Sequence, residues 1–418
     1  MGKQENKTGR EPSRKTPLVR FPGFKDEWEH KPLNKLLSLS KNTNKDLKFG
    51  KENVLSVSGE HGVVNQIGHL GRSYAGSSVH NYNVVERNQI VYTKSPLKAN
   101  PYGIIKLNKD KAGIVSTLYA VYNVKENSNG RFIEYYFSLD ANLNRYLRPL
   151  VRKGAKNTLQ ISDEESIQGK IFKPTLPEQQ KIAHFFSTLD KKLTQLQDKK
   201  NALEQYKKGM MQQIFSQQLR FKDDNGQDFP NWEEKRLGEI AIFLKGKGVS
   251  KSDISENGKN YCIRYGELYT YYREVISKIR SATNIEVTKL VLSEENDIII
   301  PASGEDAVEI ATASCVLKKG IALGGDLNII RTKSNGVFLS YYLNNKLKIK
   351  IARLAQGVSV VHLYSKQLST LKLYLPNILE QQKIAQFLTA IDDKINTVSK
   401  QIAQTKAYKK GLLQKMFV

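Results

Sequence analysis

The chain has 418 residues, of which 39% are hydrophobic and 9% aromatic. This length is too great for one ordinary core and suits two medium domains, and the apolar content excludes a disordered polybasic tail. Lys and Arg number 66 against 41 Asp and Glu, which gives a net charge of +25 and indicates a polyanionic partner. The alternatives are that the charge serves solubility or that the protein lies next to the ribosome or at a membrane surface.

Two cysteines, Cys262 and Cys315, cannot build a disulfide framework or a cysteine-based zinc site, which fits a reducing cytoplasm. Residues 1–15 carry no apolar stretch that could act as a secretory signal, and no run approaches the ~18 apolar residues that span a bilayer. We therefore expect a soluble, cytoplasmic protein that associates with the nucleoid and not with membranes. Residues 1–20 are predicted to form a disordered basic tail.

Residues 21–173 are predicted to form the first of two mixed α/β domains. The run Asn88–Thr93 is strand-like, and the pattern Arg131–Leu147 is helical. Basic residues interleave with aromatic residues, so phosphates could be neutralised while polar side chains meet base edges and glycines let the backbone approach. A solvated surface charge is the alternative for each residue. The candidates for DNA contact here are Arg72, Tyr74, His80, Tyr82, Lys94, Lys98, Arg152, Lys153 and Lys156.

Residues 174–218 are predicted to form a helical spacer. Apolar residues recur at spacings of three and four, which is typical of a helix with one narrow apolar seam, and Pro174 stands just ahead of its start. From Glu178 to Phe215 such a helix would be roughly 57 Å long at ~1.5 Å per residue. Lys200 and Lys207 fill two further seam positions. The apolar seam consists of Ile182, Phe186, Leu189, Leu193, Leu196 and Leu203.

Residues 219–375 are predicted to form the second mixed domain, with strands at Asp297–Ile300 and Leu327–Ile330 and a helical pattern at Val337–Leu354. Beyond its start, this domain shares little sequence with the first, which is expected if one scaffold reads two different targets. Its candidates for DNA contact are Lys245, Lys247, Lys251, Tyr265, Tyr269, Tyr271, Arg273, Gln356 and Gly357.

Residues 376–418 repeat the spacer. A shift of 202 residues places Phe172–Phe215 on Tyr374–Phe417 without a gap, and the blocks Glu-Gln-Gln-Lys-Ile-Ala and Tyr-Lys-Lys-Gly recur identically. A weaker repeat precedes each domain, where Phe21 and Trp28 resemble Phe229 and Trp232. The chain is therefore a tandem duplication. The second apolar seam consists of Ile384, Leu388, Ile391, Ile395, Val398 and Ile402.

Two matched apolar seams of this length favour pairing with each other. The first helix leads directly into the second domain, which leads into the start of the second helix, so a parallel pair would require that domain to bridge the full helix length. We therefore predict an α+β fold in which two mixed α/β recognition domains are separated by a long antiparallel two-helix coiled coil, with a pseudo-twofold internal repeat. Packing of each seam inside one globular domain is the alternative.

Motifs for catalysis are absent from the sequence. There is no Gly-x4-Gly-Lys-Ser/Thr phosphate loop, and no two prolines are consecutive, which excludes the Asn/Asp-Pro-Pro-Tyr/Phe motif of amino-methyltransferases. His61 and His69 are interpreted as ordinary histidines and not as metal ligands, and the pairs Glu294-Glu295 and Glu305-Asp306 as solvated turns. We expect neither a catalytic site nor a metal site in this chain.

The order of a variable domain, a Pro-x3-Glu-Gln-Gln-Lys-Ile-Ala helix ending in Tyr-Lys-Lys-Gly, and the same again resembles the specificity subunit of type I restriction-modification systems. The resemblance covers essentially the whole chain from about Phe21. It implies that each domain reads one half of a bipartite asymmetric DNA site and that the helices fix the unspecified spacer. In such families a Gln-Gly like Gln356-Gly357 often lies in a DNA-facing loop, whereas the first copy has Lys153-Gly154 instead.

The resemblance also implies partners. Two methyltransferase subunits would carry S-adenosylmethionine, and two translocating restriction subunits would use ATP and Mg²⁺. This chain itself is expected to bind none of these cofactors and to be non-catalytic, although the assembled complex would be a site-specific deoxyribonuclease and adenine methyltransferase.

Two other functions compete with this interpretation. A self-contained nuclease-methyltransferase would need phosphate and methyl-donor motifs, which the sequence lacks. A coiled-coil scaffold that binds DNA without sequence preference would show no preferred site, and its affinity for any duplex would fall uniformly with salt.

Overall fold

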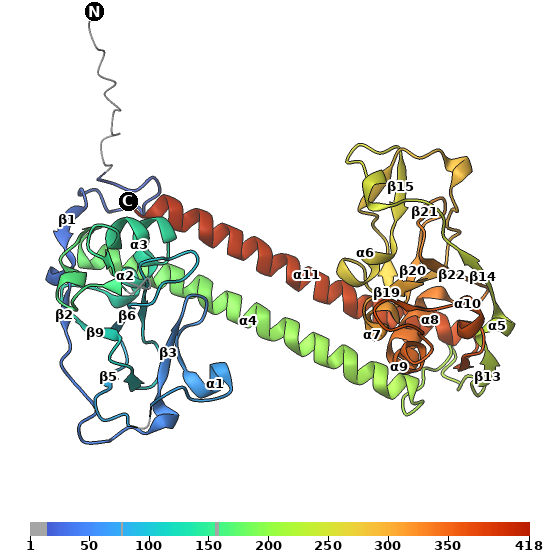
Figure 1. Cartoon of the computed structure of the whole chain (residues 1–418), viewed down its shortest axis with the longest axis horizontal. Helices are drawn as coiled ribbons and strands as arrows, with labels where there is room; N and C mark the ends of the chain where they lie inside the picture. Colours follow the sequence, from blue (N-terminus) through green and yellow to red (C-terminus); the bar gives the residue numbers. More distant parts are fainter. Residues whose placement is uncertain (1–14, 77, 155–158) are drawn as a thin grey trace, which may run out of the picture. The chain divides into compact units, whose positions relative to one another are not determined.

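The computed structural model describes residues 15–76, 78–154 and 159–418. The chain divides into two compact units, called here the first unit (residues 1–196 and 401–418) and the second unit (residues 197–400). Each unit contains an α+β domain together with part of each of two long helices, α4 (Leu176–Phe215) and α11 (Ile378–Met416) (Figure 1).

The first unit is built on a four-stranded antiparallel sheet in the order β2-β9-β6-β7. All four residues of β6 are buried, as expected for an apolar run in the middle of a sheet, and this strand confirms the one predicted at Asn88–Thr93. The other strands pair antiparallel as β1–β12, β3–β4, β5–β8 and β10–β11. The bounds are β1 (Glu29–Pro32), β2 (Leu37–Leu39), β3 (Leu55–Ser58), β4 (Gly62–Asn65), β5 (Asn83–Val85), β6 (Ile90–Thr93), β7 (Ile104–Leu107), β8 (Gly113–Val115), β9 (Tyr119–Val124), β10 (Arg152–Lys153), β11 (Leu159–Gln160) and β12 (Lys170–Lys173).

The helical pattern Arg131–Leu147 forms two helices, α2 (Gly130–Phe137) and α3 (Asp140–Leu147), and the short helix α1 (Gln66–Leu70) follows β4. The interruption between α2 and α3 has a local cause. Ser138 Oγ donates to the carbonyl oxygen of Tyr135 at 2.7 Å, and Leu139 adopts an extended backbone (φ −84°, ψ 113°) that starts the next helix.

The second unit contains a five-stranded sheet in the order β14-β22-β18-β20-β16 and a three-stranded sheet in the order β17-β15-β21. Strands β18 and β22 confirm the two predicted strands, and their pairing places the apolar run Ile298–Ile300 at the centre of the larger sheet. Two further pairs are β13–β24 and β19–β23. The bounds are β13 (Glu233–Arg236), β14 (Ala241–Lys245), β15 (Asn260–Ile263), β16 (Val275–Ile276), β17 (Ser281–Thr283), β18 (Asp297–Pro301), β19 (Ser303–Gly304), β20 (Ser314–Val316), β21 (Ala322–Leu323), β22 (Leu327–Thr332), β23 (Val361–His362) and β24 (Lys372–Leu375).

The helices of the second domain are short. The predicted helical pattern Val337–Leu354 is occupied by α8 and α9 with a π-helical segment, Leu343–Leu347, between them. The bounds are α5 (Leu237–Ile240), α6 (Tyr265–Thr270), α7 (Ala307–Ile310), α8 (Gly336–Tyr342), α9 (Lys348–Ala352) and α10 (Ser365–Leu368).

The two long helices run antiparallel within each unit. In the first unit Lys409 of α11 forms an ion pair with Asp190 of α4, and in the second unit Lys207 of α4 lies 2.8 Å from Asp392 of α11. A late residue of one helix thus faces an early residue of the other in both units. Eight of the twelve seam residues chosen from the sequence are buried, and Leu189, Leu193, Leu196 and Leu203 are half-buried.

Each domain is fastened to the helices by an equivalent aromatic cluster. In the first unit the Trp28 ring lies 5.8 Å from Phe132 and 6.3 Å from Phe417, which follows the end of α11. In the second unit Trp232 lies 5.9 Å from Phe338, whose ring is 6.1 Å from Phe215 at the end of α4. The weak sequence repeat around the tryptophans therefore corresponds to a repeated core contact.

Part of the segment assigned to a basic tail is packed. The N–H of Val19 donates to the carbonyl oxygen of Lys415 at 3.0 Å, the N–H of Trp28 donates to that of Lys15 at 3.0 Å, and Arg20 pairs with Glu178. These contacts hold residues 15–20 against the first unit, and residues 1–14 lie outside the described part of the chain. In the described ranges, no helix has the length and apolar character that crossing a bilayer requires.

Candidate nucleic-acid interface

The repeated Glu-Gln-Gln motif joins each domain to the start of its helix. In the first unit the amide of Gln179 donates to the carbonyl oxygen of Pro174 at 3.0 Å and accepts the N–H of Asn129 at 3.1 Å. Gln179 is fully buried, so both bonds are shielded from water. The motif therefore sets the position of the domain, and the second unit repeats both bonds at 2.9 Å with Gln381, Pro376 and Asn335.

The first surface of interest lies around Arg72 in the first unit. Its guanidinium stacks over the Tyr74 ring at 4.6 Å, and both residues are exposed. His80 is exposed and its Nδ1 lies 3.0 Å from Asn81 Oδ1, whereas Tyr82 is half-buried against Val79. Arg72, Tyr74 and His80 are thus free to meet a ligand, and Tyr82 is partly structural.

The remaining first-unit candidates differ in their environment. Lys98 and Arg152 are exposed. Lys94 forms an ion pair with Asp163, and its side chain is only 18% exposed, so its charge is already neutralised within the domain. Lys153 belongs to β10, but its side chain, like all of Lys156, lies outside what the structure describes.

In the second unit, two groups of candidates flank the sheets. Lys245, Lys247 and Lys251 are exposed near the end of β14. Tyr269, Tyr271 and Arg273 are exposed on and after α6, while Tyr265 is half-buried against the core of the smaller cluster that contains Leu268. Burial raises the pKa of Tyr269. Tyr265 therefore serves packing, as does the half-buried Tyr272, whereas Tyr269, Tyr271 and Arg273 are exposed.

Gln356 and Gly357 lie at the base of a tight hairpin. The backbone groups of Gln356 and His362 exchange two hydrogen bonds of 2.9 and 2.7 Å, and Gly357 adopts φ +126°, where a side chain would be strained. Val358 at the tip is 99% exposed. A fully exposed apolar residue on an anchored hairpin is suited to contact with a base edge or a thymine methyl group.

The glycines near Lys245 have an internal role. A Cβ on Gly246 would lie 1.9 Å from the carbonyl oxygen of Gly324, and the N–H of Lys247 donates to the carbonyl oxygen of Leu323 at 2.9 Å. The general expectation that glycines let the backbone approach phosphates is therefore wrong for Gly246, because another backbone segment already fills that space.

Three exposed residues join these surfaces although the sequence reading did not single them out. The Arg280 guanidinium lies 4.1 Å from the Tyr271 ring, and Lys245 lies 5.9 Å from the Tyr364 ring, which stacks with His362 at 6.2 Å. Arg280 lies outside the run of aromatic residues from which the candidates were chosen. His362 and Tyr364 are separated from Lys245 by more than a hundred positions. No local pattern could have associated them.

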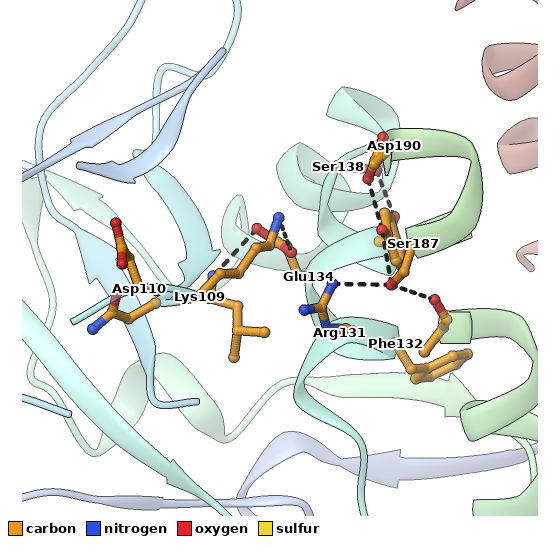
Figure 2. Close-up of polar contacts among 12 residues, drawn as sticks. Lys109, Asp110, Arg131, Phe132, Glu134, Ser138, Ser187 and Asp190 are labelled. Atoms are coloured by element: carbon orange, nitrogen blue, oxygen red, sulfur yellow. Dashed lines mark hydrogen bonds and ion pairs between the residues drawn. The ribbon is translucent and has the colours of Figure 1, made fainter. Parts of the chain in front are cut away.

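Charged side chains also gather where the first domain meets the helices (Figure 2). Arg131 donates to Ser187 Oγ at 3.0 Å, Tyr135 OH donates to Asp190 at 2.7 Å, and Lys109 lies 2.8 Å from Glu134. Burial raises the pKa of Tyr135, which therefore stays a neutral donor to the carboxylate. These groups line a pocket of about 500 Å³.

No metal-binding cluster of three or more His, Cys, Asp or Glu residues occurs in residues 15–76, 78–154 and 159–418. The His61 and His69 rings do meet, with centroids 5.1 Å apart, because β4 and α1 fold back on each other. Their proximity was not apparent from the sequence, where they are eight residues apart. Asp306, interpreted as part of a turn, accepts the N–H groups of Val308 and Glu309 and caps α7.

Comparison with known proteins gives relatives of one kind. Over 209 residues, the chain is 31% identical to the Type I restriction enzyme MjaVIII specificity subunit of Methanocaldococcus jannaschii, a match that covers 49% of this chain and 46% of the relative. It is 27% identical over 268 residues to the Putative type I restriction enzyme MjaX specificity subunit of the same organism, covering 63% and 62%. The matches thus span about half to three fifths of these relatives.

A solved structure has a similar fold. The S subunit of a Type-I restriction-modification system from M. genitalium is 15% identical, covers 96% of this chain and 99% of its own, and superposes with a TM-score of 0.60. The family model described as Type I restriction modification DNA specificity domain matches residues 25–205 and again residues 230–406. Each match begins near one of the two tryptophans and ends inside one of the two long helices. The chain therefore belongs to the type I restriction modification DNA specificity domain family and carries two copies of that domain.

Proposed function

We propose that this chain is the DNA-recognition subunit of a type I restriction-modification enzyme and that each unit reads one half of a bipartite, asymmetric site. The observation that carries the proposal is the doubled specificity domain: the buried Gln179 and Gln381 make equivalent contacts between domain and helix in the two units, whereas the exposed surfaces differ. Equivalent attachment of the two domains to the helices, combined with different exposed surfaces, suits the recognition of two different half-sites.

The chemistry of the two surfaces supports this reading. The first unit presents Arg72 stacked on Tyr74, and the second presents Arg280 stacked on Tyr271. Guanidinium groups can bind guanine edges or phosphates, and a stacked ring holds the group in place. The net charge of +25 supplies the attraction for the DNA backbone that specific and non-specific binding share.

The long helices are proposed to set the spacer between the half-sites. Helix α4 has 40 residues and α11 has 39, and each contributes residues to both units. An α-helix of 40 residues is about 60 Å long. Because a paired helix resists compression, the number of its residues is a natural determinant of the distance between two half-sites, which face one side of the duplex when they lie about one DNA turn apart.

The same helices offer two equivalent docking surfaces. Tyr206 and Tyr408, at matching positions of α4 and α11, are 50% and 57% exposed. Gly209 and Gly411 stand one turn later, and a Cβ on either would meet nothing within 4 Å. A glycine inside a helix costs about 0.5–1 kcal/mol relative to alanine, so its occurrence in both copies favours the close approach of a partner.

We infer that two methyltransferase subunits and two translocating restriction subunits complete the enzyme. Two equivalent surfaces suit two copies of a partner. S-adenosylmethionine, ATP and Mg²⁺ belong to those partners, and this chain recognises DNA and contributes no catalytic residue. The complete complex is proposed to act as an adenine methyltransferase and a site-specific deoxyribonuclease.

The proposal is tested by mapping N6-methyladenine across the genome of the host with and without this gene. The expected result is one bipartite, asymmetric motif that is methylated only when the gene is present. Binding of the purified chain, with its methyltransferase partner, to random duplex and to that motif then measures the preference directly. A complex with equal affinity for both duplexes at every salt concentration would instead support the non-specific scaffold.

A further inference from the structure

Lys207 is a buried cation with three partners in the second unit. Only 7% of this residue is exposed. Its ammonium group lies 2.8 Å from Asp392 of α11 and 3.4 Å from Glu274, which immediately precedes β16. It also lies 4.9 Å from the centre of the Tyr341 ring. One lysine therefore connects α4, α11 and the recognition domain.

Lys409, the equivalent lysine of the other repeat, has no ion-pair partner in its own domain among the described residues. Lys409 pairs with Asp190 and lies 5.3 Å from the Tyr135 ring, as expected from the repeat. The two other carboxylates of its pocket have different partners, since Glu134 pairs with Lys109 at 2.8 Å and Glu60 lies 3.9 Å from His61. In the described part of the chain, both lysines thus contact a tyrosine ring of their domain, but only Lys207 also forms an ion pair with a carboxylate of its domain.

Glu274 lies at the end of an exposed segment of candidate DNA-contacting residues. Tyr269, Tyr271 and Arg273 precede it, and Tyr269 and Arg273 line a pocket of about 460 Å³ together with Lys207. Behind this segment the backbone is fixed to the core, because Cys315 N–H and Ser340 Oγ both donate to the carbonyl oxygen of Glu274 at 2.8 Å. The Glu274 side chain ties this segment to α4 through Lys207.

We propose that Lys207 is a positioning residue for base reading by the second unit. Through its ion pair with Glu274 it fixes the segment Tyr269–Arg273 on the helix pair, so that these side chains reach the DNA at one height and angle. The Lys207 side chain is 9% exposed and that of Glu274 is 16% exposed, and an ion pair with little exposure to water holds its geometry more strictly than an exposed one. This inference rests on the proposed function for its consequence, but not for its structural part.

The structural part is tested by hydrogen exchange on the full chain without DNA. Glu274→Ala removes the link and leaves Lys207 paired with Asp392, so the helix pair is retained. The expected result is faster exchange in residues 265–276 and unchanged exchange in α4 and α11. Lys409→Met is the matched control and should leave residues 265–276 unchanged. Equal exchange in the wild type and Glu274→Ala would overturn the inference, whatever the function of the chain.

The functional part is tested by the methylation motif produced in cells by the wild type, Glu274→Ala, Lys207→Arg and Lys409→Met. Glu274→Ala should lower discrimination in the half-site read by the second unit by about tenfold, the size of one weakened base contact, and leave the other half-site unchanged. Lys207→Arg keeps the charge and should keep the wild-type motif. Equal relaxation of both half-sites, or none, in Glu274→Ala would contradict the assignment. A wild type that produces no bipartite motif would instead refute the proposed function alone.

Discussion

Arg220 and Glu380 form a two-pronged ion pair at the start of α11, with Nε to Oε1 at 3.2 Å and Nη2 to Oε2 at 2.7 Å. The Glu380 side chain is fully buried and also accepts the indole N–H of Trp232 at 3.2 Å. Arg20 and Glu178 repeat the arrangement at the start of α4, with both distances at 2.7 Å. The repeated glutamate therefore has the same structural task in both copies.

Removing this glutamate should destabilise its unit. Glu380→Ala leaves Arg220 without its buried partner, which typically costs about 3–5 kcal/mol. Denaturant unfolding followed by tryptophan fluorescence measures the loss. Glu233→Ala is the matched control because its carboxylate is 71% exposed and pairs with Lys235 at the surface, where such a pair is worth about 0–1 kcal/mol. Equal effects of the two substitutions would contradict the importance of burial.

Lys98 and Lys94 should differ in DNA binding although they are close in sequence. Lys98 is exposed, whereas Lys94 is neutralised by Asp163. Lys98→Ala should weaken binding to all duplexes and reduce the slope of log affinity against log salt by about 0.9, the value of one phosphate contact. Lys94→Ala should change that slope less and lower stability instead. Fluorescence anisotropy at several salt concentrations provides the measurement, and identical slopes for both variants would contradict the prediction.

A seven-residue insertion in both helices should lengthen the spacer of the DNA site. Since Lys207 faces Asp392, Lys200 lies level with Ser399, and an insertion before Lys200 is matched by one after Ser399. Seven residues preserve the apolar seam and add about 10 Å, or about three base pairs.

The methylation motif of the insertion variant provides the measurement. Both half-sites should keep their sequences while the spacer grows. The control carries the insertion in α4 alone, which shifts the seam out of register and should abolish methylation. An unchanged spacer in the matched double insertion would show that the helices do not set the distance.

The two cysteines should make stability depend on pH in the alkaline range. Burial raises the pKa of the Cys262 thiol to about 11 and that of Cys315 to about 12, from the ordinary value of 9.0. At a pH between 9.0 and these raised pKa values, the unfolded chain has lost thiol protons that the folded chain retains. The free energy of unfolding therefore falls as pH rises above about 9.

Urea unfolding at pH 8, 9 and 10 measures this dependence, with Cys262→Ser/Cys315→Ala as the comparison. The double variant should lose less stability over this range than the wild type. Rapid alkylation of both thiols in the native protein at pH 8 would contradict the burial that underlies the prediction, because it requires an accessible thiolate.

Alanine substitutions at Gly209 and Gly411 should have opposite effects on the stability of the chain and on its assembly with a partner. Alanine at either position meets nothing within 4 Å and should raise the free energy of unfolding by about 0.5–1 kcal/mol, since it removes a helix-interior glycine. If a partner approaches the helix closely there, each alanine should weaken its binding. Size-exclusion chromatography with the methyltransferase subunit measures assembly, and stabilised variants that assemble normally would contradict a close contact at these positions.

Local sequence patterns were sufficient for the elements whose side chains repeat regularly. The seam spacing of three and four predicted both long helices. The runs Asn88–Thr93, Asp297–Ile300 and Leu327–Ile330 predicted strands, which correspond to β6, β18 and β22, each with a neighbour on both sides in its sheet. The break after Phe137 was not predictable from the period alone, because it depends on one hydroxyl bonding to its own helix and on an extended residue after it.

The candidate interface was only partly predictable. Composition identified regions rich in basic and aromatic residues, but it could not distinguish Lys98 from Lys94, since the ion pair of Lys94 with Asp163 joins residues far apart in the sequence. The same holds for His362 and Tyr364, which lie near Lys245 only in the folded domain. Exposure and charge neutralisation are properties of the fold.

The amino-acid sequence was sufficient to show that the chain is a duplication, that each copy ends in a long amphipathic helix and that the protein is strongly basic. Periodicity, identity and charge are properties of the linear order of residues and need no knowledge of the fold. Which charged side chains are already paired within the protein, and which remain exposed to a ligand, depends on the folded chain. Lys207 and Lys409 occupy the same position of the repeat, yet Lys207 alone lies beside a carboxylate of its domain, Glu274. The reason is physical: an ion pair depends on where two separate chain segments meet, and no local pattern contains that information.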